Sequence, residues 1–346
     1  LNVFKYLTFR TGLSVITSLT VVFIIGGPLI KIFSEKMITG PIRQDGPIDH
    51  IIKKSGTPTM GGVIIIIGII SSTLLWADLT NIYIWTLMFV SLSLGGLGLL
   101  DDVLKIKFKN SQGLKSKYKF VGQLIISSLT LLILIKFSDH NYLYDLYFPF
   151  FKNLIWHMGV FFIPFGLFVI IGASNAVNLT DGLDGLATVP VMLVALSFTL
   201  ISYIVGNTIF SDYLQIQYIP DVGELSIFGG SIVGACLGFL WYNAPPAKIF
   251  MGDTGSLSLG GSLAAIAIIV KHEIVLAIIG GLFVLETVSV IIQVISFKLT
   301  GKRIFKMAPI HHHFEKKGWA ESTIVIRFWI IAIILALVGL ATLKLR

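Results

Sequence analysis

The sequence predicts an all-α integral membrane protein with about ten transmembrane helices, and three observations lead to this fold class. The mean hydropathy is +0.89, and 55% of the residues are hydrophobic. Only 13% are charged, whereas soluble domains usually carry about 25% charged residues. Apolar stretches of about 20 residues, the length that crosses a bilayer, recur along the whole chain. No repeat or linker divides it, so we expect a single membrane domain over residues 1–346.

Windows of about 20 mostly apolar residues define the expected spans, with boundaries accurate to a few residues. Very short turns join the second span to the third and the eighth to the ninth. The expected spans are residues 13–33, 60–77, 82–100, 120–137, 154–174, 186–205, 225–242, 257–271, 274–297 and 323–343.

Basic residues set the expected orientation of these spans. One set of alternate loops holds 17 of the 26 lysines and arginines, whereas the opposite loops and turns hold only Lys152 and Lys271. The positive-inside rule places the first set in the cytoplasm, with both termini outside. The cytoplasmic loops are then residues 34–59, 101–119, 175–185, 243–256 and 298–322.

Composition excludes several kinds of site and partner. The single cysteine, Cys236, lies in an apolar stretch, so a disulfide framework or a zinc site built from cysteines is impossible within one chain. The net charge of +8 would suit a nucleic-acid-binding protein. Cytoplasmic basic loops explain this charge more simply, and we expect no nucleic-acid partner.

An aspartate pair ends the third span. Asp101-Asp102 follows the small residues Gly95-Gly-Leu-Gly98, which let helices approach closely, and precedes a lysine-rich loop. Adjacent carboxylates repel each other unless a cation balances them. The pair is consistent with a magnesium–phosphate site or a general base, and an ordinary charged helix end explains it equally well.

A second motif, Asn178-Leu-Thr-Asp181-Gly-Leu-Asp184-Gly, is more specific. On a helix, its three polar side chains would share one sector of the surface. Helix capping explains one of these residues but does not require three. We therefore expect a binding function.

The third motif enters the eighth span and contains Phe250-Met-Gly252-Asp253-Thr-Gly-Ser256. Asp253 would lie at a helix start, where free N–H groups favour bound anions. An acidic residue there suggests that a divalent ion mediates the anion contact. A simple helix cap would explain Asp253, but not the preceding Pro245-Pro246 and Lys248.

Two further polar features lie near the end of the chain. The run His311-His312-His313 lacks the spacing of a zinc site, but its imidazoles could bind phosphate or sugar hydroxyls. Glu286 falls within the ninth span. A transporter would use such an acid, but its isolation favours a structural hydrogen bond to a neighbouring helix.

Taken together, these motifs resemble those of the phospho-N-acetylmuramoyl-pentapeptide-transferase family, within the polyprenyl-phosphate N-acetylhexosamine-1-phosphate transferase superfamily. The resemblance runs in order from about residue 4 to the C-terminus, and the run Pro309-Ile-His-His-His-Phe-Glu315 points to the muramoyl-peptide branch. It implies transfer of phospho-MurNAc-pentapeptide from UDP-MurNAc-pentapeptide to undecaprenyl phosphate, giving lipid I and UMP. It also implies a Mg²⁺ requirement, a homodimer and location in the bacterial inner membrane.

The resemblance assigns roles residue by residue. Asp253 is the expected magnesium ligand, Asp101 would deprotonate or orient the lipid phosphate, and Asp102 would support the metal or a lysine. Lys117 would contact a phosphate. His312 is also an expected catalytic residue, together with Lys117 and the three aspartates. Direct attack by the lipid phosphate is favoured over a covalent phospho-aspartate. The expected substrate-binding residues are Lys54, Thr59, Asn178, Asp181, Asp184, Asn243, Phe250, Gly252, Ser256, His311, His312 and His313.

Two alternatives remain at this stage. A sister enzyme that transfers GlcNAc-1-phosphate would use the same aspartates. A secondary transporter or lipid flippase would use Glu286, although paired broken segments in two halves of the chain, which are typical of transporters, are not apparent.

Overall fold

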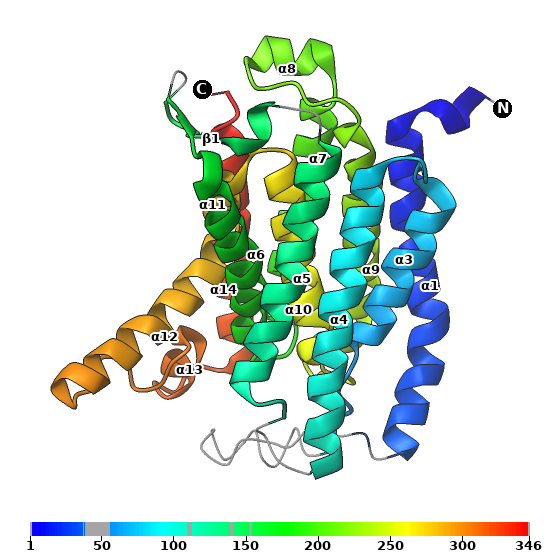
Figure 1. The fold of residues 1–346 in the computed structure, drawn as a ribbon. Coiled ribbons are helices and arrows are strands. Elements are labelled where there is room, and N and C mark those ends of the chain that lie inside the picture. The colour runs from blue at the N-terminus through cyan, green and yellow to red at the C-terminus, as the bar shows by residue number, and fades with distance from the viewer. Residues whose placement is uncertain are drawn as a thin grey trace.

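A computed structural model of the chain describes residues 2–36, 38, 56–108, 113–138, 141–151 and 154–344. Lys54, one of the expected substrate-binding residues, lies outside this part. Most of the described residues form helices (Figure 1). The α-helices are α1 (Leu7–Glu35), α3 (Gly62–Trp76), α4 (Ile82–Phe108), α5 (Ser116–Phe137), α6 (Phe162–Thr180), α7 (Thr188–Val205), α8 (Thr208–Leu214), α9 (Leu225–Asn243), α10 (Gly252–Ile269), α11 (Glu273–Ile279), α12 (Gly281–Thr300), α13 (Ile310–Glu315) and α14 (Glu321–Ala341).

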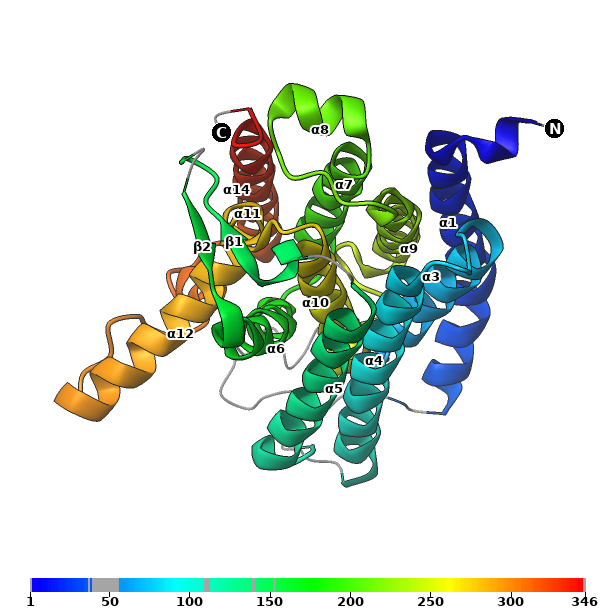
Figure 2. The ribbon, with the colours of Figure 1, turned by 45° about the horizontal axis from the view of Figure 1, so that its top comes forward.

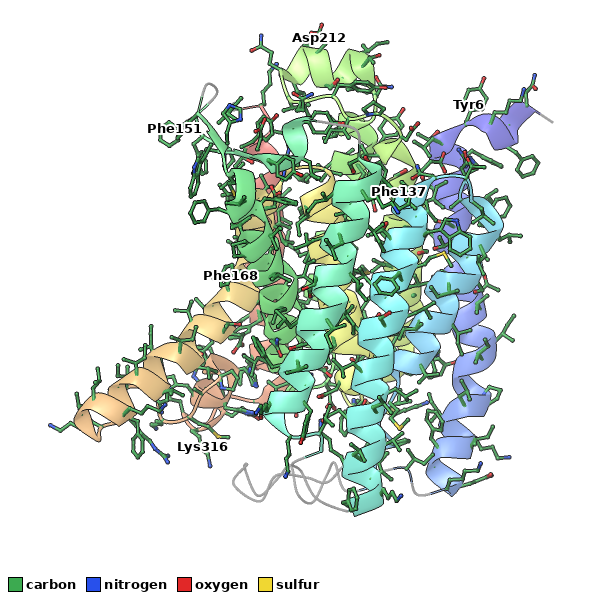
Figure 3. All side chains as sticks on the ribbon, viewed as in Figure 1. Tyr6, Phe137, Phe151, Phe168, Asp212 and Lys316 are labelled. Carbon is green, nitrogen blue, oxygen red and sulfur yellow. The ribbon has the colours of Figure 1, made fainter. Side chains whose placement is uncertain are left out.

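The helices confirm an all-α polytopic membrane protein. Within the described residues, nine helices are long and apolar enough to cross a membrane, and α3 is a shorter apolar helix of 15 residues. Apolar side chains such as Phe168 point outward along the sides of the bundle (Figure 3). Asp212 and Lys316 lie at opposite ends. This distribution suits a bundle whose sides face lipid and whose ends face water.

The ninth expected span, residues 274–297, differs from the structure. The chain forms the short helix α11, breaks at Gly280, and continues as α12, which leaves the bundle obliquely (Figures 1 and 2). Two consecutive glycines, Gly280 and Gly281, weaken helical continuity there. Hydropathy alone could not show this break, because both segments are apolar.

A small hairpin was also not expected from the sequence. The strands β1 (Asp145–Tyr147) and β2 (Ile155–His157) pair antiparallel, with Leu146 opposite Trp156. The hairpin lies at the end of the bundle where both chain termini lie (Figure 2).

Helix α10 forms the centre of the bundle. It packs against α3, α4, α6 and α7, and every residue from Thr254 to Ile269 is buried. A helix that is apolar or small on all sides can be enclosed in this way. The position of α10 is therefore fixed by its neighbours all round.

Two glycines allow the closest contacts with the beginning of α10. A Cβ atom added at Gly62 of α3 would lie 2.0 Å from the backbone nitrogen of Gly255. One added at Gly98 of α4 would lie 2.2 Å from the carbonyl oxygen of Asp253. Small residues let membrane helices approach backbone to backbone, and here that approach sets the position of Asp253.

The Gly98→Ala variant should therefore be destabilised, because its methyl group forces α4 and α10 apart. Overpacking of this kind costs about 1–3 kcal/mol, so the melting temperature in detergent should fall by several degrees. Gly96→Ala is the matched control on the same helix, since an added Cβ there meets no described atom within 4 Å. Equal melting temperatures for the two variants would contradict this packing.

Candidate functional site

Three carboxylates converge where the C-terminal part of α4 passes the beginning of α10. Asp101, Asp102 and Asp253 each offer an oxygen atom, and these atoms lie within 4.8 Å of one another. The ends of α5 and α6 contribute further polar side chains to the same place. This region lies at the end of the bundle opposite the two chain termini (Figure 1).

The carboxylate of Asp102 caps the beginning of α10 from a neighbouring helix. Its Oδ2 accepts hydrogen bonds from the backbone nitrogen of Thr254 at 3.0 Å and from Thr254 Oγ1 at 2.7 Å. Its Oδ1 accepts one from the backbone nitrogen of Asp253 at 3.2 Å. These N–H groups have no partner within their own helix, and a negative charge is favourable at this end. Asp102 thus fixes the backbone that carries Asp253.

Gly252 is required at this junction for two reasons. Its φ is +73°, a conformation that costs other residues free energy. A Cβ there would also lie 2.7 Å from Asp102 Oδ2. Glycine therefore allows the chain to turn tightly beneath the carboxylate and enter α10.

Asp253 is surrounded by donors from three other helices. Lys119 Nζ of α5 donates to its Oδ2, and Lys105 Nζ of α4 lies 3.1 Å from its Oδ1. Asn178 Nδ2 of α6 donates to the same Oδ1 at 2.9 Å and to Ser256 Oγ at 2.8 Å. Asp253 is therefore the meeting point of the network.

Asp101 is linked to this network through Lys105. The Nζ of Lys105 lies 2.5 Å from Asp101 Oδ2, and the backbone nitrogen of Leu114 donates to Asp101 Oδ1 at 2.7 Å. The side chain of Asp101 is almost completely buried. Charge-assisted contacts are what make such a buried carboxylate tolerable.

The donor set suits a hard divalent cation such as Mg²⁺, which prefers carboxylate oxygens. Among the described residues, the three carboxylates of this cluster meet two ammonium groups, those of Lys105 and Lys119. Asp102 directs its oxygens at the backbone of α10. Asp253 and Asp101 instead contact the ammonium groups of lysines, so these two carboxylates could hold a cation in exchange for those contacts.

A second cluster of expected residues lies around the loop between α6 and α7. Asn243 Oδ1 accepts hydrogen bonds from the Gly185 backbone at 3.1 Å and from Thr188 Oγ1 at 2.8 Å, and its Nδ2 donates to the Ile249 carbonyl at 2.9 Å. Asp184 Oδ2 accepts from the Ala247 backbone at 2.9 Å. Asn243, which we had expected to approach substrate, thus joins two loops.

The last helix of the chain also holds this loop. The backbone nitrogen of Asp184 donates to Glu321 Oε1 at 2.9 Å. Trp329 Nε1 donates to the carbonyl oxygen of Gly185 at 3.2 Å. Helix α14 therefore gives the loop further contacts in addition to those of Asn243.

Thr59 and Phe250 lie on two paired segments that precede α3 and α10. The backbone nitrogen of Phe250 donates to the Pro58 carbonyl at 2.9 Å, and the Gly61 nitrogen donates to the Phe250 carbonyl at 2.8 Å. Thr59 is buried, whereas the Phe250 ring is partly exposed.

The three histidines have different environments. His311 is completely buried, with its Nδ1 3.0 Å from Glu286 Oε1. His312 Nδ1 lies 2.6 Å from Glu315 Oε2. His313 accepts a hydrogen bond from the Lys306 backbone at 3.0 Å, and burial, together with nearby Lys317 and Lys306, lowers its pKa.

The structure brings some expected residues together and leaves others apart. Asp101, Asp102, Asp253, Asn178 and Ser256 form one connected network. Lys117 is exposed on the first turn of α5 and lies outside that network.

Sequence reasoning gave no specific role to Lys105 and Lys119, which contact Asp253 directly. The spacing of Lys105 four residues after Asp101 could have indicated their pairing on a helix. The contact of Lys119 depends on how α5 packs, and local sequence carries no such signal.

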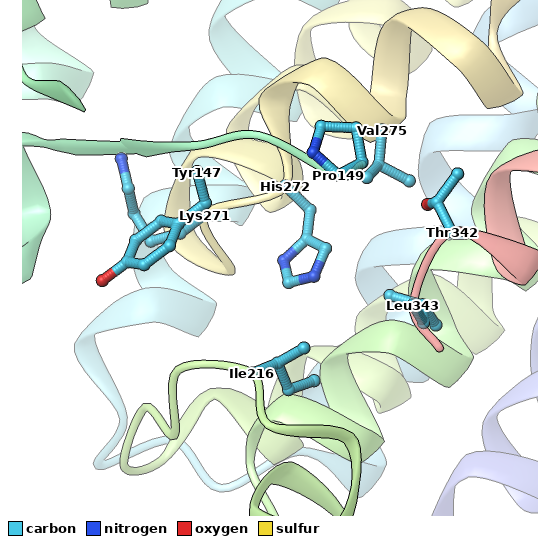
Figure 4. Close-up of a pocket in the computed structure, with 8 residues that line it drawn as sticks. All are labelled: Tyr147, Pro149, Ile216, Lys271, His272, Val275, Thr342 and Leu343. Carbon is cyan, nitrogen blue, oxygen red and sulfur yellow. The ribbon is translucent and has the colours of Figure 1, made fainter. Parts of the chain in front are cut away.

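A small cavity at the opposite end of the bundle is not a substrate site (Figure 4). Its volume is about 10 Å³, which is room for about one water molecule. The Lys271 ammonium beside it is paired with Glu273 Oε1 at 2.7 Å. The lining residues are Tyr147, Pro149, Ile216, Lys271, His272, Val275, Thr342 and Leu343.

Comparisons with known proteins agree with the motifs. The profile of glycosyl transferase family 4 matches residues 84–271. The phospho-N-acetylmuramoyl-pentapeptide-transferase signature 1 matches residues 54–66. The phospho-N-acetylmuramoyl-pentapeptide-transferase of Pelagibacter ubique (strain HTCC1062) is 68% identical over 346 residues, which make up 100% of this chain and 96% of that protein.

The role of Asp102 as a cap can be tested without any substrate. Asp102→Asn keeps the size of the side chain but replaces one acceptor oxygen with a donor that faces other donors. A hydrogen bond to a charged group contributes about 1.5–3 kcal/mol, so the melting temperature should fall. Hydrogen exchange at Asp253 and Thr254 should become faster.

Asp212→Asn is the control for this experiment, because Asp212 is an exposed carboxylate on α8 at the other end of the bundle. Asp212→Asn should change neither the melting temperature nor the hydrogen exchange at Asp253 and Thr254. Unchanged exchange at the start of α10 in Asp102→Asn would show that the cap contributes little.

Proposed function

The chain belongs to the phospho-N-acetylmuramoyl-pentapeptide-transferase family, and from this membership we infer that it transfers phospho-MurNAc-pentapeptide from a UDP carrier to undecaprenyl phosphate. The products are lipid I and UMP, and the reaction is the first membrane step of peptidoglycan synthesis. The enzyme is a multi-pass protein of the bacterial inner membrane. The observation that carries this conclusion is the 68% identity over the whole chain.

The chemistry of the reaction matches the composition of the site. An oxygen of the lipid phosphate attacks the phosphorus that bears the sugar, and the bond from that phosphorus to the UMP oxygen breaks. Both substrates are anionic, so their mutual repulsion must be screened. Positioning and electrostatic stabilisation perform most of the work in phosphoryl transfer. Lys105 and Lys119 are the cations that this site supplies.

Mg²⁺ is part of this proposal, with Asp253 as its main ligand and Asp101 beside it. When bound, the ion would screen the phosphate charges and polarise the bond that breaks. Asp101 orients the lipid phosphate, or accepts its proton if it arrives protonated. Asp102 acts indirectly by holding the start of α10. We favour direct attack, because the lipid phosphate is already a nucleophile.

The donor nucleotide is proposed to bind near the α6–α7 loop. Asn178, Asp181 and Asp184 lie on or beside this loop, and Phe250 would stack on the uracil ring. The remaining substrate-binding roles, including those of Lys54, Thr59 and the three histidines, rest on the motif resemblance. His312, held by Glu315, is proposed to approach the diphosphate or sugar.

The orientation in the membrane and the assembly are also proposed. The carboxylate network would lie at the cytoplasmic face, where the soluble nucleotide meets the lipid phosphate. The opposite end, with both chain termini, would then face outward (Figure 1). A homodimer is the assembly that the family resemblance implies.

The function can be tested by measuring UMP release from the purified protein in detergent. UDP-MurNAc-pentapeptide, undecaprenyl phosphate and Mg²⁺ should together give UMP, and EDTA should stop the release until Mg²⁺ is added again. Asp253→Asn should have no measurable turnover and serves as the inactive control. Release with UDP-GlcNAc in place of the muramoyl donor would instead identify the sister enzyme. Lipid translocation without UMP release would indicate a transporter.

The two lysines of α5 offer a matched pair of variants. Lys119→Ala removes an ammonium that contacts Asp253, and kcat should fall about 100-fold or more, as for other preorganised charges at reacting groups. Lys117→Ala removes an exposed charge two residues away, and its effect should be much smaller. Initial rates at saturating concentrations of both substrates measure the difference. The opposite ranking would favour Lys117 as the phosphate-contacting residue.

A further inference from the structure

Glu286 is completely buried although it lies on α12, the helix that leaves the bundle. Neighbouring residues of α12, such as Val284 and Leu285, are exposed. The Glu286 carboxylate faces inward, where α12 packs against α6, α13 and α14. A buried carboxylate with no function would be costly to retain in this position.

The partner of Glu286 is His311 of α13. Glu286 Oε1 lies 3.0 Å from His311 Nδ1, and both side chains are completely buried. Among the described residues, neither the two carboxylate oxygens nor the two ring nitrogens have a hydrogen-bond partner, and the 3.0 Å approach of Oε1 to Nδ1 is their closest polar contact. A small rotation of the imidazole would let the two groups share a proton, which reduces the cost of burying both.

The other side of the His311 ring faces the α6–α7 loop. A Cβ added at Gly182 would lie 2.3 Å from His311 Nε2 and 2.9 Å from Cε1. The backbone of the loop therefore rests directly on the imidazole edge. Gly182 stands between Asp181 and Asp184 in the sequence, so the position of the ring affects both of these carboxylates.

We propose that Glu286 is a positioning residue for the nucleotide donor, acting through His311 on the α6–α7 loop. This inference rests on the role of that loop in donor binding, proposed above. A carboxylate that accepts the Nδ1 proton fixes the tautomer and orientation of an imidazole. The fixed ring then supports the loop at Gly182. Glu286 itself contacts no substrate.

This role predicts a selective kinetic effect. Glu286→Leu leaves Nδ1 without an acceptor, so the ring and the loop lose their fixed position. The KM for UDP-MurNAc-pentapeptide should rise about tenfold, as is usual when an orienting partner is removed. The KM for undecaprenyl phosphate and kcat should change less, by about twofold at most, because among the described residues no hydrogen bond or ion pair joins Glu286 or His311 to the carboxylates around Asp253.

Conservative variants make the test independent of folding. Glu286→Gln keeps an oxygen that can accept the Nδ1 proton, and it should restore most of the donor affinity. Glu286→Asp keeps the charge but withdraws it from the ring, so it should raise the donor KM. Thr287→Val is the control on the same helix, since Thr287 Oγ1 bonds only to the carbonyl of Phe283 among the described residues. It should leave the donor KM unchanged.

A double-mutant cycle tests whether the effect passes through His311. In a His311→Phe background, Glu286→Leu should produce no further rise in the donor KM. Additive effects would overturn the proposal, and so would equal changes in kcat and both KM values. A wild-type donor KM in Glu286→Asp would also overturn it.

The variant Asp181→Asn distinguishes a failure of the positioning role of Glu286 from a failure of the assignment of the α6–α7 loop to donor binding. If Asp181→Asn raises the donor KM and the Glu286 variants do not, only the positioning role is wrong. If Asp181→Asn leaves the donor KM unchanged, the assignment of the loop to the donor is wrong, and the positioning role fails with it. Release of UMP by the wild-type protein tests the overall function independently of both.

Discussion

The arrangement of the site depends on the way α10 begins. Asp102 accepts hydrogen bonds from the backbone of Asp253 and Thr254, while Gly62 and Gly98 allow α3 and α4 to approach the same turn. Because α10 is buried from Thr254 onward, its first turn cannot shift without disturbing the whole bundle. The carboxylate of Asp253 is therefore placed by packing before any substrate arrives. Such preorganisation makes electrostatic stabilisation effective, since no reorganisation is needed during the reaction.

The charges in this site come from helices that are distant in sequence. Asp101 and Lys105 belong to α4, Lys119 to α5 and Asp253 to α10. Each carboxylate is balanced by an ammonium or by backbone N–H groups, so the acidic cluster is stable within an otherwise apolar protein. In the proposed reaction, the same lysines serve as counter-charges for the phosphates of the substrates. One set of interactions thus supports both the folded state and the reaction.

The membrane fold could be predicted from sequence because the bilayer requires long apolar helices. The oblique exit of α12 could not, since hydropathy is the same for an upright and a tilted helix. Within the site, the aspartate motifs were visible as clusters in the sequence. The difference between Lys117 and Lys119 depends on which side chain in the first turn of α5 reaches Asp253. The hydrogen bonds of Asn243 could not be predicted either. An asparagine at this position suits substrate binding, and only the structure shows that its side chain also joins two loops.

The contacts of α14 with the α6–α7 loop have a consequence for biosynthesis. Glu321 and Trp329 lie in the final helix, yet they hold Asp184 and Gly185, which are synthesised much earlier. During insertion into the membrane, the ribosome must synthesise the chain through α14 before this loop gains these supports. A nascent chain that stops after α12 would therefore carry the residues of the carboxylate network but lack the contacts of Glu321 and Trp329 with the loop.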